Sequence, residues 1–375
     1  MAIRFHRPRP ISAAPCQSSG ALLVAIVVTH DRLAHLRRTV RALLDSPPSE
    51  LAALVVVDNA SCDDTCAWLA CVADPRLHVL RLSRNMGGAG GFAVGLRYAR
   101  RRFGADWMLL MDDDAHPEPG ALRAFHASDL TGWDAIAGAV YLPDGAICDL
   151  NRPSWNPFAN WRSFLHTALR GREGFHLDAA AYAGRRIVPV DAASYVGLFL
   201  SRRALDLTGP PDRRLFIYCD DMLQTLQLTR AGGRIGFHPA LRFAHDMPRN
   251  VAGTVRVPLW KSYYKIRNSL ILYRTAAGWL FGPICLIVLP RWLAGAWAFP
   301  GQRRAFLRLF RHAVWHGLCD DRRTGHAQVL AWADGGADDP LPAHQDTLTL
   351  CSARNSVPSS CVQTNSKSPG AAART

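Results

Sequence analysis

Hydrophobic positions in the first third of the chain alternate between continuous apolar runs and helically spaced sets. The runs predict buried parallel strands, which are covered on both faces and therefore lack polar alternation. The predicted strands are residues 22–29, 51–58, 77–82 and 107–111. The predicted helices between them are residues 32–44, 63–72 and 91–102. This alternation predicts an α/β fold, with a Rossmann-like, mostly parallel sheet flanked by helices.

The pattern changes after this region. Residues 133–190 are rich in Pro, Trp, Asn and Gly, which predicts mixed strands and loops around a second substrate site. A helix is predicted at 221–231, because two glycines follow it as a stop signal. A strand is predicted at 234–237.

An apolar segment near the C-terminal end predicts contact with a membrane. Residues 276–290 are apolar but contain Pro283, and Arg291 separates them from the apolar stretch at 292–299. Neither stretch reaches the roughly 20 residues that a spanning helix needs. Tryptophans in this segment and arginines after it favour an interfacial or re-entrant position on anionic lipid. The alternative is a pair of ordinary core helices.

Composition narrows the class of protein. The chain has 375 residues, 49% of them hydrophobic, which is enough for a large core. Lys and Arg exceed Asp and Glu by 44 − 30 = 14, so an anionic partner is expected. Ten scattered cysteines without zinc-site or disulfide-framework spacing indicate a reducing compartment. The first 20 residues lack the apolar core of a secretory signal, and a cytoplasmic location is therefore expected.

Three consecutive carboxylates, Asp112, Asp113 and Asp114, follow the fourth predicted strand. Ligands of α/β sheets bind at the carboxyl ends of the strands, where these residues lie. Three adjacent carboxylates repel one another unless a cation sits among them. Their oxygens suit Mg²⁺ or Mn²⁺, which commonly binds a substrate diphosphate. The alternative is a solvated acidic turn.

Two other segments near strand ends have more than one interpretation. Asp58 ends the second strand and is a candidate acceptor for the N–H of uracil or thymine, or a helix N-cap. The glycine-rich run at 85–91 contains a G-x-G-x-x-A pattern, as in nicotinamide enzymes. In nicotinamide enzymes, however, this pattern lies in the first strand–helix unit, and one acidic residue follows it about 20 residues later. Here two strand–helix units precede the run, and three consecutive carboxylates stand in place of the single acidic residue. The glycines are therefore expected to let the backbone approach a sugar or phosphate.

A second acidic pair, Asp220 and Asp221, opens the helix predicted at 221–231. These residues either compensate the helix dipole or supply the general base for an acceptor hydroxyl. His245 follows the last predicted strand and is either a third metal ligand or a structural histidine.

Taken in order, these segments resemble glycosyltransferase family 2, whose members are inverting enzymes with the GT-A fold. The likeness extends over residues 22–274. Residues 27–32 (VVTHDR) and 55–61 (VVVDNAS) resemble the opening and nucleotide-contacting motifs of that family. Residues 85–96 (NMGGAGGFAVGL) resemble a galactofuranosyltransferase segment, and residues 111–115 (MDDDA) resemble the metal motif.

The resemblance implies roles for individual residues. Asp112, Asp114 and His245 would hold Mn²⁺ or Mg²⁺, and Asp221 would be the catalytic base. Contacts to the nucleotide sugar are implied for Thr29, Arg32, Asp58, Asn85, Gly87, Gly88 and Asp113. Contacts to the acceptor are implied for Asp220, Tyr195 and Gly197. Residues 263–268 (YYKIRN) resemble a segment that follows the catalytic domain in such enzymes.

The implied reaction is inverting transfer of a sugar from a nucleotide diphosphate donor to a hydroxyl of a cell-envelope or lipid-linked glycan. UDP-galactofuranose is the expected donor, and dTDP-rhamnose is the alternative. Leu223 and Gln227 depart from the family pattern and leave an inactive scaffold open. An NAD(P)-binding oxidoreductase and a basic nucleic-acid-binding protein are the other competing classes. The triple carboxylate argues against the first, and the spread of basic residues argues against the second.

The resemblance and the composition together predict four regions. Residues 1–20 are expected to be flexible. Residues 21–255 form the predicted GT-A domain, with a nucleotide-sugar half at 21–132 and an acceptor half at 133–255. Residues 256–330 form a helical, membrane-associated extension, and residues 331–375 are a tail expected to be disordered. The enzyme is expected at the inner face of the cell membrane.

Overall fold

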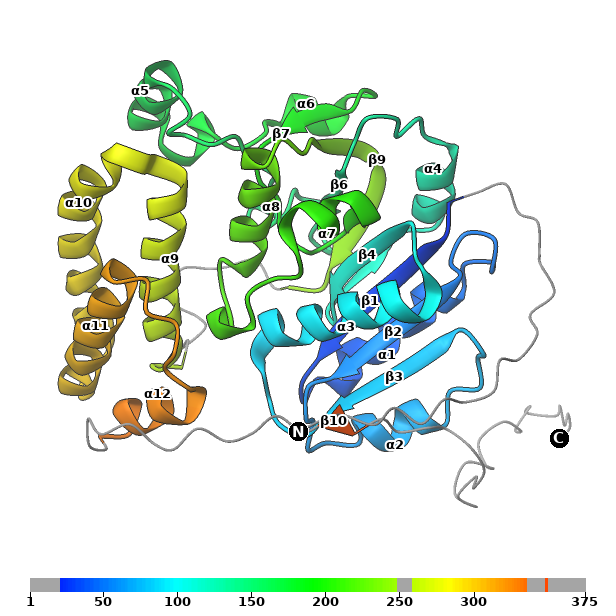
Figure 1. The fold of residues 1–375 in the computed structure, drawn as a ribbon, viewed down its shortest axis with the longest axis horizontal. Coiled ribbons are helices and arrows are strands. Elements are labelled where there is room, and N and C mark those ends of the chain that lie inside the picture. Colours follow the sequence, from blue (N-terminus) through cyan, green and yellow to red (C-terminus); the bar gives the residue numbers. More distant parts are fainter. Residues whose placement is uncertain (1–20, 248–257, 336–347, 350–375) are drawn as a thin grey trace, which may run out of the picture.

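The computed structural model describes residues 21–247, 258–335 and 348–349. They form a mixed α/β sheet with helices on both faces and a helical extension at one side (Figure 1). The elements in chain order are β1 (Leu23–Thr29), α1 (Leu33–Leu44), β2 (Ala53–Asp58), α2 (Thr65–Ala70), β3 (Leu77–Leu82), α3 (Gly87–Phe103), β4 (Trp107–Asp112), β5 (Ala115–Pro117), α4 (Ala121–Ala127), β6 (Ala135–Tyr141), α5 (Trp161–Arg170), η1 (Gly171–Gly174), α6 (Ala179–Ala183), β7 (Val188–Val190), β8 (Leu198–Ser201), α7 (Arg202–Thr208), η2 (Arg213–Leu215), α8 (Asp220–Arg230), β9 (Ile235–His245), α9 (Lys261–Ala277), η3 (Gly278–Leu280), α10 (Phe281–Leu293), η4 (Ala294–Ala298), α11 (Arg303–Leu318), α12 (His326–Ala333) and β10 (Leu348–Thr349).

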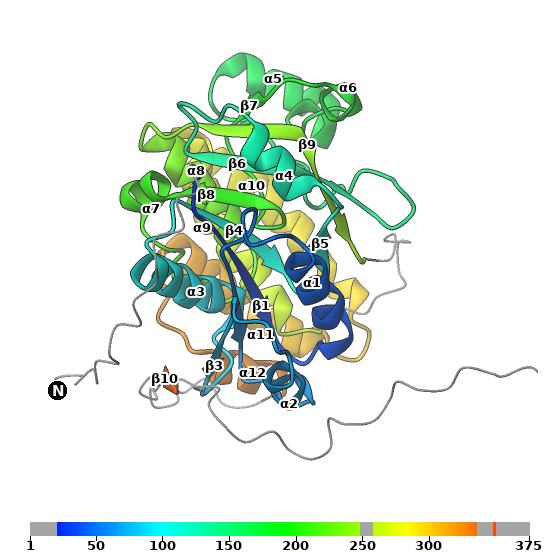
Figure 2. The same cartoon turned by 90° about the vertical axis from the view of Figure 1, so that its right-hand side faces the viewer.

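The parallel strands β3, β2, β1 and β4 lie side by side in that order, as the apolar runs predict. Alternate residues of β1 enter two separate cores. One core contains α3, and the other contains α1 and α4 (Figure 2). The register pairs Thr29 with Asp58 and Val28 with Asp112. Three chemically interesting strand ends are thereby brought to one edge of the sheet.

The two halves of the predicted GT-A domain share a single sheet. Strand β8 runs antiparallel to β4, and β6, β9 and β5 continue the sheet beyond it. Strand β9 spans 11 residues, so the predicted strand at 234–237 is only its beginning. Its last residue, His245, pairs with Ala115 of β5. This pairing places His245 beside the carboxylates, although the two lie far apart in sequence.

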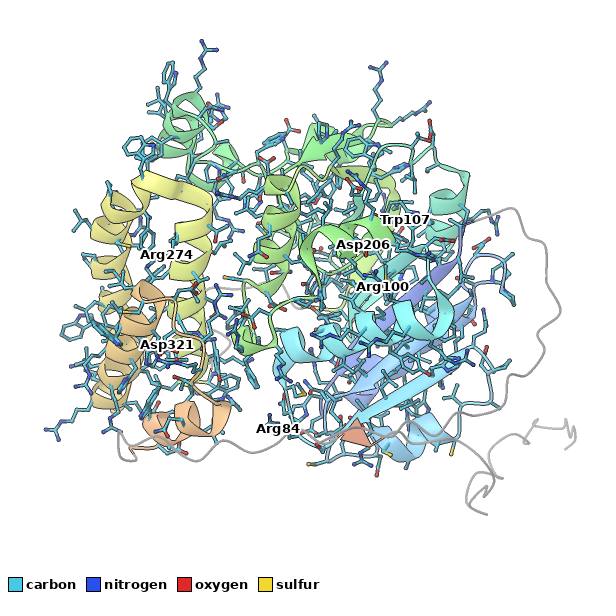
Figure 3. All side chains as sticks on the ribbon, in the orientation of Figure 1. Arg84, Arg100, Trp107, Asp206, Arg274 and Asp321 are labelled. Atoms are coloured by element: carbon cyan, nitrogen blue, oxygen red, sulfur yellow. The ribbon has the colours of Figure 1, made fainter. Side chains whose placement is uncertain are left out.

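Helix α3 begins at Gly87, four residues before the predicted start, and the glycine-rich run forms its first turns. The run allows the helix to lie unusually close to β1. A Cβ on Gly91 would lie 2.4 Å from a methyl of Val28, and one on Gly95 would lie 2.4 Å from a methyl of Ile26. The sequence did not predict this start, because glycine has a poor helix propensity. Tertiary packing overrides that propensity here. An ion pair between Arg100 and Asp206 joins α3 to α7 (Figure 3).

Helices α9 to α12 occupy the predicted extension and pack around their own apolar core. The chain turns at Gly278, where φ is 55°, so that α10 returns beside α9 (Figure 1). The combined stretch Lys261–Ala298 is long and apolar enough to cross a membrane by length and composition. Helix α10 itself has only 13 residues, about 20 Å, which is shorter than the hydrocarbon core of a bilayer.

Two regional predictions concern residues that are largely not described. The flexible N-terminus predicted at 1–20 lies outside the described residues, as does most of the tail predicted from residue 331. Within that tail, α12 continues to Ala333. Leu348 and Thr349 pair with the edge strand β3 in antiparallel fashion, which was not predicted.

Gly87 and Gly88 give a matched test of the packing. We expect Gly87→Ala to lower the free energy of unfolding by more than about 1 kcal/mol. The residue has φ +69°, and a Cβ would lie 2.0 Å from the carbonyl oxygen of Phe216. Gly88→Ala should be neutral or stabilising, since a Cβ there meets nothing within 4 Å. Denaturant unfolding of both variants without ligand measures the difference, and equal destabilisation would contradict this close approach.

Candidate functional site

The second and third carboxylates of the triplet are held by residues from the end of β1. The hydroxyl of Thr29 donates to Asp113 Oδ2 at 2.7 Å. The guanidinium of Arg32 contacts Asp113 Oδ1 at 3.1 Å and Asp114 Oδ2 at 2.8 Å. Burial raises the pKa of Asp113 to about 6, even though Arg32 and Thr29 oppose that rise. Thr29 and Arg32 were predicted to contact the nucleotide sugar. In this structure they hold the carboxylates of Asp113 and Asp114.

Asp114 and His245 form a buried pair. His245 Nε2 lies 3.1 Å from Asp114 Oδ1, and His245 Nδ1 lies 2.8 Å from Asn151 Oδ1. Burial raises the pKa of Asp114, but the hydrogen bond and charge of His245, together with Arg32, lower it to about 2. Burial lowers the pKa of His245, whereas the bond to Asp114 and its other partners raise it to about 10. The Asn151 contact orients the ring and leaves Nε2 toward the carboxylates.

Asp112 differs from its two neighbours. Among the described residues nothing donates a hydrogen bond to its carboxylate or forms an ion pair with it, and the residue is half-buried at the end of β4. Burial and the charge of Asp114 raise the pKa of Asp112 to about 7. A carboxylate that is destabilised by its surroundings and lacks a counterion suits a hard divalent cation. Asp112, Asp114 and His245 thus have the right chemistry, although the described side chains include no preformed group of three such donors.

The predicted base pair faces this triplet from another element. Asp220 and Asp221 open α8, and both interact electrostatically with Asp112. Burial raises the pKa of both residues, and their mutual repulsion adds to the rise for Asp220. The main-chain N–H groups of Met222 and Tyr195 donate to Asp221 and partly offset the effect of burial. The structure therefore brings the triplet and the pair to one place, as the sequence predicted.

The turn that delivers this pair has an unusual backbone. Phe216, Tyr218 and Cys219 all have positive φ, at 66°, 71° and 61°. Non-glycine residues rarely adopt such angles, and each costs of the order of 1–3 kcal/mol unless the surroundings impose it. Runs of this kind cluster at functional sites.

The C-terminal extension holds this turn. Asn268 of α9 is buried, and its amide nitrogen lies 2.9, 2.8 and 3.0 Å from the carbonyl oxygens of Leu215, Ile217 and Tyr218. Arg267 is fully buried; it donates to Leu215 O at 3.2 Å and lies over the ring of Tyr264 at 5.1 Å. The sequence motif at 263–268 contains both residues but predicted no role for either. The available signal was the motif at 263–268 itself, whose polar pair stands between the apolar positions Ile266 and Leu270.

Asp58 is the strongest candidate for recognition of a nucleobase. It is completely buried; its Oδ1 accepts a hydrogen bond from Ser61 N at 2.8 Å. Its Oδ2 has no hydrogen-bond partner in the described structure, and the nearest cation is Arg81 Nε at 3.6 Å. A buried carboxylate oxygen without a donor is costly, so it suits a ligand N–H. The predicted role of Asp58 agrees with this geometry.

Several predicted contacts prove to have structural partners. Asn85 accepts hydrogen bonds from Asn59 Nδ2 at 3.1 Å and Gly87 N at 2.8 Å, which shape the start of α3. The absence of a side chain at Gly87 accommodates the Phe216 carbonyl rather than a ligand. Gly88 alone among these three faces open space, so it remains the best candidate for a close approach by a donor.

The predicted acceptor contacts Tyr195 and Gly197 also lie inside the protein. The hydroxyl of Tyr195 donates to Gln224 Oε1 at 2.6 Å, and its ring is buried against Phe92. A Cβ on Gly197 would lie 2.6 Å from the ring of Phe243, and its φ is +71°. Both residues brace the sheet and α8, and Tyr195 reaches the site through its main-chain N–H to Asp221. In this geometry neither residue presents a side chain to an acceptor.

Residues 24–193 match the family model described as Glycosyl transferase family 2. The chain is 31% identical over 211 residues to galactofuranosyltransferase GlfT1 of Mycobacterium tuberculosis, a match that covers 56% of this chain and 64% of that protein. It is 26% identical over 293 residues to GlfT1 of Mycolicibacterium smegmatis, covering 76% of this chain and 91% of the relative. The match therefore spans less than two thirds of the first relative. The predicted family resemblance is confirmed.

The fold has a counterpart among solved structures. A crystal structure of GalNAc-T7 with UDP, GalNAc and Mn²⁺ superposes with a TM-score of 0.51 at 13% sequence identity. The match covers 69% of this chain and 48% of that chain. At such low identity the likeness concerns the fold alone, and the predicted GT-A arrangement is confirmed.

Asp112→Asn tests the proposed cation. Without metal we expect this variant to be at least as stable as the unchanged protein at pH 8. A carboxyl whose pKa is raised in the folded state contributes stability at low pH, and that contribution is lost as pH rises through about 7. Mn²⁺ at about 100 times its dissociation constant should stabilise the unchanged protein by about 2.7 kcal/mol. The variant should lose most of this gain.

Thermal unfolding with and without Mn²⁺ measures both effects. The gain should be smaller at pH 5.5, where protons compete for the carboxylate. Asp45→Asn, an exposed carboxylate at the far end of α1, is the control and should keep the full Mn²⁺ effect. A metal response that survives in Asp112→Asn would show that Asp112 does not bind the ion.

Proposed function

We propose that the chain is an inverting, nucleotide-sugar-dependent glycosyltransferase, because residues 24–193 match the family model described as Glycosyl transferase family 2. The single observation that carries the proposal is the meeting of two acidic groups at one edge of the sheet. The triplet 112–114 suits a cation and a diphosphate, and Asp221 suits a proton acceptor.

The nucleotide diphosphate part of the donor lies, in this proposal, along the ends of β1, β2 and β4. Asp58 Oδ2 accepts the base N–H. Arg32 contacts the triplet, and Lys261 lies near Arg32, because burial and the charge of Arg32 lower the pKa of Lys261. Positive groups at this position complement a diphosphate. Asp112, Asp114 and His245 would hold a divalent ion, which supplies charge neutralisation to the departing diphosphate.

Asp221 performs the proton transfer. The acceptor oxygen attacks the anomeric carbon from the side opposite the diphosphate, so the new C–O bond forms as the bond to the diphosphate oxygen breaks. The hydroxyl proton passes to Asp221, and the nucleotide diphosphate leaves with the electron pair. The raised pKa makes Asp221 a stronger base than an ordinary carboxylate. A single displacement of this kind inverts the configuration of the sugar.

Galactofuranose from UDP-galactofuranose is the proposed sugar, because two relatives are named galactofuranosyltransferases. The GalNAc-T7 structure of the same fold contains UDP and Mn²⁺, which agrees with the proposed uridine donor and cation. The proposed acceptor is a hydroxyl of a cell-envelope or lipid-linked glycan. The apolar stretch Lys261–Ala298 supports a peripheral place at the inner face of the cell membrane. A rhamnosyltransferase that uses dTDP-rhamnose is the second candidate, since a thymine N–H would suit Asp58 equally.

A panel of nucleotide sugars tests the reaction. We expect release of nucleotide diphosphate from UDP-galactofuranose, dependent on Mn²⁺ or Mg²⁺ and accelerated by a galactan or lipid-linked acceptor. Release from dTDP-rhamnose alone would favour the second candidate. The absence of release from every donor, with NAD(P) binding instead, would overturn the proposal.

Asp221→Asn separates chemistry from binding. We expect kcat to fall by about 10²–10⁴, the usual contribution of a general base, while the dissociation constant of the donor stays nearly unchanged. In the unchanged protein kcat should decline on the acid side at a pH above 4, the ordinary carboxyl value, because the pKa of Asp221 is raised. Kinetics across pH and calorimetric titration of UDP measure these quantities. Loss of UDP binding in this variant would contradict the base assignment, and Asp45→Asn is again the control.

A further inference from the structure

Helix α5 presents an apolar side that is largely exposed in the described structure; only Phe164 packs on another ring, that of Phe158. No residue of this helix is buried. Trp161 is 70% exposed and Leu169 is 77% exposed, and Phe164 and Leu165 are exposed between them. Residues at i, i+3, i+4 and i+8 share one side of a helix, so these four form a continuous apolar stripe. Soluble proteins rarely expose such a stripe without a binding partner.

The side of α5 next to this stripe is basic, and the guanidinium of Arg162 lies over the ring of Trp161 at 5.5 Å. Arg162, His166 and Arg170 recur every four residues, and the helix contains no acidic residue. Asn160 caps its first turn by accepting a hydrogen bond from Ser163 N at 3.0 Å. A capped, amphipathic helix with a tryptophan on its apolar side and arginines on its polar side is typical of helices that lie in a membrane interface.

Helix α5 lies next to the turn between α9 and α10 (Figure 1). Asn156, just before α5, donates to the carbonyl oxygen of Ala276 at 3.1 Å. The ring of Phe158 packs on Tyr273 of α9 at 6.5 Å, and Tyr273 stacks on Trp292 of α10 at 6.1 Å. This chain of contacts ties the position of α5 to the α9–α10 hairpin.

The hairpin exposes apolar residues of its own. Trp279 in the turn is 86% exposed, and Leu286 of α10 is 79% exposed, with Ile287 and Trp297 also exposed. Arg291 is exposed beside them. Both elements therefore combine apolar side chains with arginine. Tryptophans, which prefer the headgroup region of a bilayer, lie in the first turn of α5 (Trp161), in the turn of the hairpin (Trp279) and in η4 just after α10 (Trp297).

We propose that α5 and the α9–α10 hairpin form one docking surface for an anionic membrane. The surface is defined by its exposed apolar residues. They are Trp161, Phe164, Leu165, Leu169, Trp279, Leu286, Ile287 and Trp297. An anionic bilayer is the occupant because arginines flank both apolar elements and the chain has a formal net charge of +14. The inference rests on the proposed membrane location and adds to it a second contact, from a different part of the chain.

The second contact has a consequence for the acceptor. Along the chain, helix α5 comes between β6 and β7, within the half predicted to bind the acceptor. The hairpin belongs to the predicted extension. One contact alone allows the protein to rotate about it, and two contacts define how the domain is oriented on the bilayer. A membrane-bound domain oriented in this way would receive an acceptor that is itself held in the membrane.

Vesicle binding by the full-length protein tests the surface. The unchanged protein should co-sediment with phosphatidylcholine vesicles that contain anionic phosphatidylglycerol, and less with phosphatidylcholine alone. Leu165→Asp/Leu169→Asp should weaken this binding about tenfold or more, because it places charge in the apolar stripe. Its melting temperature should be unchanged, since neither side chain is buried. Leu207→Asp on α7 is a matched control for an exposed leucine and should bind normally.

A second variant distinguishes this inference from the membrane location itself. Leu286→Asp/Ile287→Asp on α10 should also weaken binding. If only the α10 variant loses binding, the role of α5 is overturned while the membrane location stands. If neither variant changes binding, or if the unchanged protein binds no vesicles, both are overturned. Equal binding to neutral and anionic vesicles would refute the anionic preference, and nucleotide release in solution reports on the enzyme separately.

Discussion

The crowding of negative charge at one edge of the sheet is the constraint on which the rest of this structure depends. Asp112 lies within electrostatic reach of the rest of its triplet and of the pair at 220–221, in surroundings that disfavour charge. Arg32 and His245 neutralise Asp113 and Asp114. The charges of Asp112 and of the pair that opens α8 have no such cationic partner among the described residues, and the pKa values of these three residues are raised. A diphosphate with its cation and a proton from a hydroxyl are the partners that would restore balance.

Holding that arrangement requires more than the GT-A domain. The turn before α8 has three residues with positive φ, and Asn268 of α9 donates to the carbonyl oxygens of Ile217 and Tyr218 in it. Gly87 lets α3 approach the same turn from the other side. The helix that leads into the exposed α9–α10 hairpin is thus also the helix that supports the proposed base. The predicted extension therefore supports the candidate site as well as being a candidate membrane contact.

The sequence predicted what depends on local pattern. Strand β3 matches its predicted bounds at both ends, and β1 and β4 differ by one residue, because continuous apolar runs mark buried strands. The start of α3 and the full length of β9 were missed, since both depend on tertiary contacts that override propensity. Several candidate site residues that the sequence identified, such as Thr29, Asp58 and Asp112, lie at strand ends. Asn151 and Asn268 escaped because a hydrogen bond across 94 or 53 positions leaves no local trace in one sequence.

The departures at Leu223 and Gln227 bear on whether the site is active. Leu223 is 3% exposed and packs in a small apolar cluster with Ala89, Leu215 and Ile271, where α3, α8 and α9 meet. An acidic residue there would be buried without a partner, so leucine fits this particular packing. Residues two apart on a helix point to different sides, and the change therefore leaves Asp221 free to face Asp112. Gln227 is exposed one turn further along α8. Neither substitution touches the paired acidic groups, so the main argument for an inactive scaffold loses its physical basis.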